Sequence, residues 1–186
     1  MHATWIYAIL LIAPLSASEH MKVSVCTQGR LTGSAVSASE NHTAALFHAI
    51  GIDIDWSPCE SAPIGDEAIQ QHWFTIRLRD DRPPGTPDSA SLDTLGQAFF
   101  SEDQAAYVAD VYYTAGQSIA AHQQVESTLL MACVMAHELG HLLLGPGHGA
   151  DGIMRAGWDS KDLDAIRKGW LRFAASESAR MHRALL

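Results

Sequence analysis

The chain has 186 residues, of which 47% are hydrophobic and 18% charged, a balance that excludes a disordered polypeptide and suits one globular domain with one core. The formal net charge of -9, without any run of Lys or Arg, excludes the basic surface that nucleic-acid binding requires. We therefore expect no nucleic-acid partner.

The N-terminal segment predicts export. Residues 5–15 form an apolar run, and the small residues 16–18 follow it, as in a secretory signal peptide and its cleavage site. Only His2 precedes the run where signal peptides carry Lys or Arg, so a buried N-terminal strand or helix is the alternative. The run is short for a membrane span. We predict a signal peptide over 1–18, a single domain over 19–186, and a secreted or periplasmic protein without stable membrane insertion.

Two strands and a disulfide are predicted next. Alternating apolar residues over 21–25 and 52–56 predict strands, and helical spacing over 37–50 predicts a helix between them. Cys26 and Cys59 each follow one of these strands. If the strands are parallel neighbours, both cysteines lie at the same end of the sheet, where a disulfide is geometrically possible. Export would favour that disulfide.

The helix predicted over 37–50 has one apolar face, which we expect to point to the core. That face contains Ala38, Ala45, Leu46, Ala49 and Ile50.

The middle of the chain predicts two further strands. Residues 66–71 predict a short turn of helix, and 72–79 predict a strand. Residues 80–90 have the composition of a solvated loop, with a flap near the site as the alternative. Residues 97–100 form a short apolar patch. Residues 105–115 are rich in aromatic and β-branched side chains, which predicts a strand.

Two helices are predicted near the C-terminus. The first covers 158–169, begins near Asp159 or Ser160, and is expected to pack against the sheet. Its apolar face contains Leu163, Ile166 and Trp170. The second covers 175–185 and has a polar outer face, on which we expect His182 to be exposed.

The clearest chemical pattern lies within residues 127–148, STLLMACVMAHELGHLLLGPGH. His137, Glu138 and His141 form H-E-x-x-H, and on a helix the two imidazoles lie one turn apart on the same face, where both can reach one zinc ion. Glu138 lies beside a ligand and is therefore placed to take a proton from a zinc-bound water rather than to bind the metal.

The surroundings of this pattern favour a metal site. His137, Glu138 and His141 are the only strongly polar side chains in residues 129–144, so this helix belongs in a core. Burial of two imidazoles and a carboxylate without a partner is costly, and a metal removes that cost. The alternative is a pair of hydrogen-bonded core histidines beside a buried ion pair. Cys133 on the same helix is expected to be a buried free thiol.

A catalytic zinc needs three protein ligands, so the third must come from outside the helix. The Gly-Pro-Gly sequence at 145–147 ends the helix and lets the chain turn back, which would bring His148 to the metal. Asp151, Asp159 and Asp162 are alternatives at a modest distance along the chain.

The segment HELGHLLLGPGH, followed by Gly152-Ile153-Met154, resembles the metzincin clan of zinc metallopeptidases. The clan's signature is H-E-x-x-H-x-x-G-x-x-H with a methionine turn beneath the metal. The helical pair and the glutamate match, whereas Gly145 and His148 each come one residue later than in the signature. The resemblance covers about residues 127–158 and implies that Met154 is the methionine-turn residue. Inside the helix, Gly140 indicates that the returning segment approaches closely.

The resemblance also implies the fold. We expect an α+β, zincin-like domain in which a small mixed sheet packs on a buried active-site helix, followed by C-terminal helices. In zincin folds an edge strand lies over this helix and binds extended peptides, and the resemblance suggests residues 105–115 for that role. Either Tyr112 or Tyr113 could stabilise an oxyanion there.

These observations predict a zinc-dependent endopeptidase that acts on peptides or proteins. Zn²⁺ would be held by His137, His141 and His148, and Glu138 would be the general base. The alternative is a catalytically inactive, zinc-stabilised binding protein with the same fold. The presence of Glu138 argues against this alternative, because a structural zinc needs no base beside its ligands.

Overall fold

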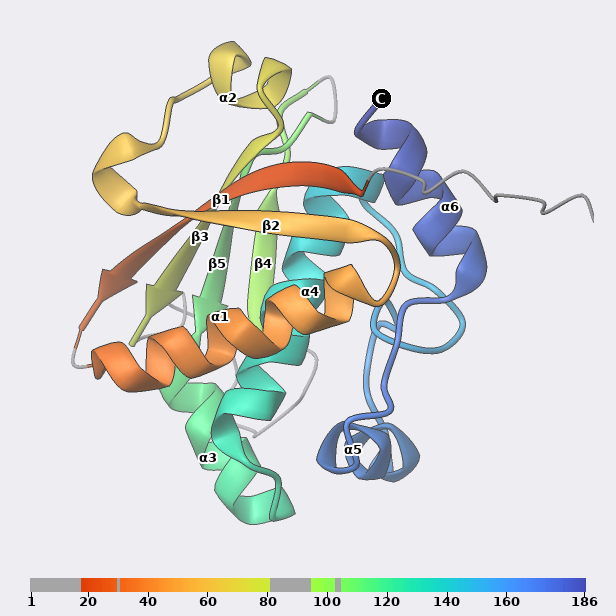
Figure 1. Ribbon diagram of the computed structural model, residues 1–186. Coiled ribbons are helices and arrows are strands. Elements are labelled where there is room, and N and C mark those ends of the chain that lie inside the picture. The colour runs from red at the N-terminus through yellow and green to blue at the C-terminus, as the bar shows by residue number, and fades with distance from the viewer. Residues whose placement is uncertain (1–17, 30, 81–94, 103–104) are drawn as a thin grey trace, which may run out of the picture.

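The computed structural model describes residues 18–29, 31–80, 95–102 and 105–186 (Figure 1). The predicted signal peptide and the predicted loop at 80–90 therefore lie outside the described residues, apart from Ser18 and Asp80. The elements in chain order are β1 (Glu19–Gln28), α1 (Gly33–His48), β2 (Ile52–Pro58), a 3-10 turn (Cys59–Ser61), α2 (Asp66–Gln70), β3 (Trp73–Arg79), β4 (Gly96–Phe99), β5 (Val108–Tyr112), α3 (Tyr113–Gln123), α4 (Ser127–Leu144), α5 (Ser160–Arg167) and α6 (Ala175–Ala184).

The strands form one five-stranded mixed sheet in the order β2-β1-β3-β5-β4. The first four strands of this order are parallel to one another, and β4 is antiparallel to β5 at the edge. Helices α1 and α4 lie on the same face of the sheet (Figure 1). The predicted α+β fold with a mixed sheet packed on a buried helix is therefore confirmed.

The edge strand is not the one that we predicted. The predicted strand over 105–115 is shorter, because β5 ends at Tyr112 and α3 begins at Tyr113. Strand β5 lies between β3 and β4, so it has no free edge. The edge is β4, Gly96–Phe99, which the sequence shows only as a short apolar patch. Local composition indicates a strand but does not reveal which strands lie beside it. It therefore does not predict that β4, rather than β5, forms the edge of the sheet.

Helix α4 is the centre of the core. It contacts the sheet and the helices α1, α3, α5 and α6, and twelve of its 18 residues are buried. Among the described residues it is also the one helix long and apolar enough to cross a membrane, but 67% of it is buried inside the domain, as in a core helix. Cys133 is a buried free thiol, as predicted.

Helix α1 buries a different face from the predicted one. Its buried residues are Ser39, Thr43 and Phe47, four positions apart, whereas Ala45 and Ala49 of the predicted face are exposed. The Thr43 hydroxyl donates a hydrogen bond to the Ser39 carbonyl at 2.8 Å. The small side chains of Ser39 and Thr43 let α1 pack against α4, and hydrophobicity alone does not identify such a face.

The predicted disulfide is confirmed. Strands β1 and β2 are parallel neighbours, with Val25 paired to Pro58, so that Cys26 and Cys59 lie at the same end of the sheet. They form a disulfide with their Cα atoms 4.8 Å apart.

The C-terminal helices lie where predicted, but their packing differs. In α5, Leu163 and Ile166 are buried as expected, whereas Trp170 lies beyond the helix and is 68% exposed. Helix α5 packs on α4 and lies apart from the sheet (Figure 1), so the prediction that it packs against the sheet is wrong. On α6, His182 is not exposed: its ring nitrogens lie 2.6 Å from Glu19 Oε2 and 2.7 Å from the Ile50 carbonyl oxygen.

Candidate metal centre

The two helical histidines face each other on α4. His137 Nε2 and His141 Nε2 are 3.0 Å apart. The other ring nitrogen of each histidine faces a backbone carbonyl. His137 Nδ1 lies 2.7 Å from the Ile153 carbonyl oxygen, and His141 Nδ1 lies 3.3 Å from the Gly145 carbonyl oxygen. A carbonyl oxygen only accepts, so each Nδ1 carries the proton and donates it. Both Nε2 atoms are therefore unprotonated, and each has a lone pair free for a metal ion.

Two unprotonated nitrogens this close can bind one cation together. Burial lowers the pKa of His137 to about 4 and also lowers that of His141, so a proton does not fill this role near neutral pH. A metal ion fits the arrangement, because histidine ligands commonly donate their other ring N–H to a backbone carbonyl.

His148 completes a group of three imidazoles. The ligand atoms of His137, His141 and His148 all lie within 4.8 Å of one another, and they form the only such group among the described residues. The rings of His137 and His141 are half-buried and buried, respectively, whereas His148 is exposed and leaves one side of the centre open to solvent. Three imidazoles with an open side are the donor set of a catalytic zinc.

The chain absorbs its one extra residue in the turn before His148. Helix α4 continues to Leu144, and Gly145 and Gly147 then adopt positive φ angles of 85° and 130°. Such angles are strained for other residues, and they reverse the chain over a few positions. The later position of His148 therefore does not keep it away from the helical pair.

The alternative third ligands are placed differently. Asp159 and Asp162 accept hydrogen bonds from Arg155, and Asp159 caps α5. Asp151 is exposed, and it does not belong to the group of potential ligand atoms found among the described residues. The geometry thus favours His148.

Glu138 is buried at the next position of α4, only 4% exposed. One carboxylate oxygen accepts the Ala98 backbone N–H of β4, while Oε2 is buried without a hydrogen-bond partner among the described residues. Burial raises the pKa of this carboxyl to about 8, with a smaller contribution from Asp110. Glu138 also lines the cleft beside the two helical histidines.

A cleft of about 270 Å³ opens above these residues. Its lining includes Gly96, Ala98 and Phe100, in β4 or just after it, and Arg155 and Trp158 of the loop after α4. Phe100 packs edge-on to His141 at a centroid distance of 6.5 Å, and Trp158 packs edge-on to His137 at 6.0 Å. Sequence reasoning missed these five lining residues as part of the site, because they come from two distant segments, 96–100 and 155–158, without a shared motif.

Met154 packs against α4 at Gly140, the residue before His141. It is 1% exposed, and a Cβ atom added at Gly140 would collide with its sulfur. The close approach predicted from Gly140 is therefore confirmed: the glycine leaves room on α4 for the returning segment.

The two tyrosines do not fill the predicted oxyanion role. Neither Tyr112 nor Tyr113 belongs to the described lining of the cleft. The Tyr112 hydroxyl lies 3.4 Å from Gln97 Oε1, and Gln117 Nε2 donates to the Tyr113 hydroxyl at 3.0 Å. Both side chains belong to the packing where β5 meets α3.

Comparison with solved structures identifies the architecture. An archaemetzincin from Methanopyrus kandleri superposes with a TM-score of 0.53 and 16% identity, over 94% of this chain and 99% of that chain. Metalloproteinase-II from Bacteroides fragilis gives a TM-score of 0.53 and 17% identity, over 92% of this chain and 55% of that one. The fold is zincin-like. No protein-family model and no curated protein matches the chain.

The zincin-like fold explains the layout of the site. The histidine pair lies on the central helix, the edge strand β4 passes over Glu138, and the loop after α4 returns with His148 and Met154. This chain spans about half the length of the Bacteroides fragilis chain.

Proposed function

We propose that this protein is a zinc-dependent endopeptidase with a metzincin-like centre. One observation carries the proposal. The Nε2 atoms of His137 and His141, 3.0 Å apart, can bind one cation together, and Glu138, with one carboxylate oxygen unpartnered among the described residues, lies at the next position of the same helix. A purely structural metal site needs no such base beside its ligands.

His137, His141 and His148 would hold the metal, and the carbonyls of Gly145 and Ile153 would keep the helical pair oriented. A bound zinc ion supplies a Lewis acid that polarises the scissile carbonyl and lowers the pKa of water. Glu138 accepts the proton of the attacking water and transfers it to the leaving amine.

The edge strand supports a peptide as the substrate. Strand β4 pairs with β5 on one side, so its other side can add an extended peptide by backbone hydrogen bonds. Such a peptide would lie directly along the cleft, since Gly96 and Ala98 form part of the wall.

We also propose that the protein is exported. The disulfide between Cys26 and Cys59 supports export, because disulfides persist in oxidising compartments and are rare in the cytosol.

The test is a zinc-loaded preparation incubated with a diverse peptide library, with a chelator-treated sample as the control. We expect internal peptide bonds to be cleaved only by the zinc-loaded protein. A protein that binds one zinc ion but cleaves no peptide would favour the zinc-stabilised binding protein instead.

A further inference from the structure

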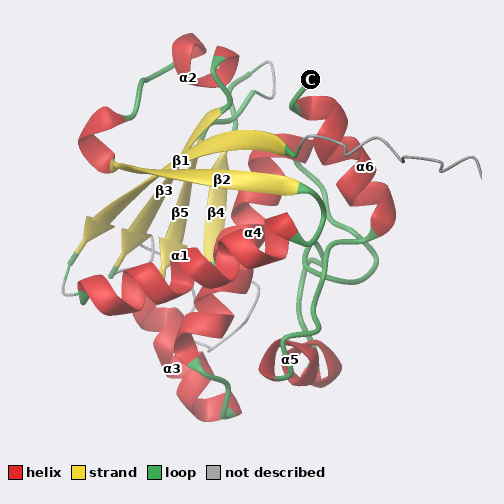
Figure 2. Cartoon of the chain, in the orientation of Figure 1, coloured by secondary structure: helices red, strands yellow, loops and turns green. Residues whose placement is uncertain are grey.

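The loop between α4 and α5 carries most of the contacts that orient the three histidines. It supplies the Gly145 and Ile153 carbonyls that bind the helical pair, as well as His148 itself. It contains neither helix nor strand (Figure 2), and Gly145, Gly147 and Gly152 all have positive φ angles. A loop with three such glycines has high conformational entropy and needs ties to hold one shape.

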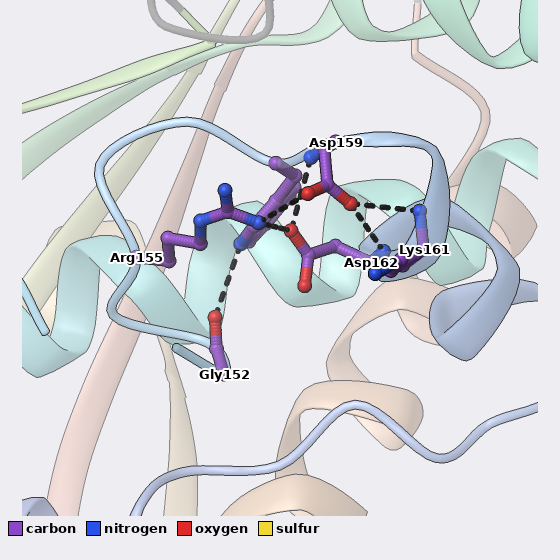
Figure 3. A network of polar contacts seen from close by, with 6 residues as sticks. Gly152, Arg155, Asp159, Lys161 and Asp162 are labelled. Carbon is purple, nitrogen blue, oxygen red and sulfur yellow. Dashed lines mark hydrogen bonds and ion pairs between the residues drawn. The ribbon is translucent and has the colours of Figure 1, made fainter. Parts of the chain in front are cut away.

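Arg155 ties this loop to the first turn of α5 (Figure 3). Its NH1 group donates to Asp159 Oδ2 at 2.8 Å and to Asp162 Oδ2 at 2.5 Å. Asp159 is the N-cap of α5, and its Oδ1 accepts the backbone N–H groups of Lys161 and Asp162. The guanidinium is thus held by two carboxylates that the helix itself positions.

Two further contacts connect Arg155 to the histidines. Its backbone bridges to Gly149, the residue after His148. The chain between Arg155 and Asp159 contains Trp158, whose Nε1 donates to the Gly152 carbonyl at 3.3 Å and whose ring packs edge-on to His137. A change at Arg155 therefore affects both sides of the centre.

We propose that Arg155 is a positioning residue for the metal centre: by binding Asp159 and Asp162, it holds the loop in the shape that presents His148 and orients His137. This inference rests on the proposed function. The Arg155 and Asp159 side chains are 35% and 47% exposed, so their ion pair contributes little to the stability of the whole domain. Loss of the ion pair is expected to change the shape of the loop rather than the stability of the domain. Zinc affinity measures that change, because the loop presents His148.

The experiment measures the zinc Kd by chelator competition and the denaturation midpoint of the metal-free protein. For Arg155→Ala we expect the Kd to rise about 10- to 100-fold, the usual effect of removing a residue that supports metal ligands. The metal-free denaturation midpoint should stay near that of the parent. Arg155→Lys keeps the charge and should recover part of the affinity.

Lys168→Ala is the matched control, because Lys168 makes an exposed ion pair with Asp164 on the same helix, at 2.6 Å. We expect its Kd to equal that of the parent. If Arg155→Ala does not fold, Asp162→Asn weakens the same contact from the other partner and should also raise the Kd. A Kd for both variants within twofold of the control would overturn the positioning role. A parent that binds no zinc would refute the proposed function, and the role of Arg155 with it.

Discussion

At the scale of single residues, Glu138 separates a catalytic zinc site from a structural one. Glu138→Gln keeps the shape of the side chain and removes the base, so the zinc content should stay near one per chain. Peptide hydrolysis should fall by about 10²- to 10⁴-fold, the usual contribution of general-base catalysis. Metal analysis and turnover assays on the same preparation measure both quantities. A variant that hydrolyses peptides as fast as the parent would contradict the mechanism.

His148 decides which residue is the third ligand. Its ligand atom lies within 4.8 Å of those of the helical pair, so His148→Ala should weaken zinc binding strongly. Asp151→Ala is the control, because Asp151 is exposed and lies three residues further along the same loop. The assignment is wrong if zinc affinity survives the change at His148 and is lost with the change at Asp151.

At the scale of elements, the returning loop fits α4 only because Gly140 has no side chain. For Gly140→Ala, higher helix propensity would stabilise α4 by about 1 kcal/mol. The added Cβ would collide with the Met154 sulfur, however, and overpacking of a core costs about 1–3 kcal/mol. We expect a net loss in the free energy of unfolding, measured by urea denaturation.

Gly33→Ala is the control for this change, since a Cβ at Gly33, in the first turn of α1, meets no atom within 4 Å. That variant should be as stable as the parent or more stable. Equal effects of the two substitutions would show that the contact between Gly140 and Met154 does not limit the packing.

At the scale of the whole molecule, the disulfide joins the C-terminal end of β1 to the 3-10 turn after β2. Removing it by a double change, Cys26→Ser with Cys59→Ser, should lower the free energy of unfolding by about 2–4 kcal/mol. Urea denaturation measures the loss. Cys133→Ala removes the buried free thiol and leaves the disulfide intact. Comparing the two variants distinguishes the effect of losing the disulfide from the effect of replacing a cysteine.

Export is tested on the same whole-molecule scale by the intact mass of the protein recovered outside the cytoplasm. We expect a chain that begins near residues 17–19 and that lacks two hydrogens because of the disulfide between Cys26 and Cys59. A full-length cytoplasmic product with three free thiols would refute both expectations.

The sequence by itself determined the features that depend on local spacing. The H-E-x-x-H spacing brings His137 and His141 together on any helix, because four residues make about one turn. The glycines around Pro146 likewise predicted the turn toward His148. Alternating residues before Cys26 and Cys59 predicted two strands, and a disulfide between the cysteines if these strands were parallel neighbours.

Only the tertiary structure decided the features that depend on contacts between distant segments. The choice of β4 over β5 as the edge, the burial of Ser39 and Thr43, and the contact of His182 with Glu19 follow from which elements become neighbours. Phe100 and Trp158 line the cleft for the same reason. The periodicity of a segment reports which of its faces is apolar, but the neighbour that covers that face is chosen by the packing of the whole chain.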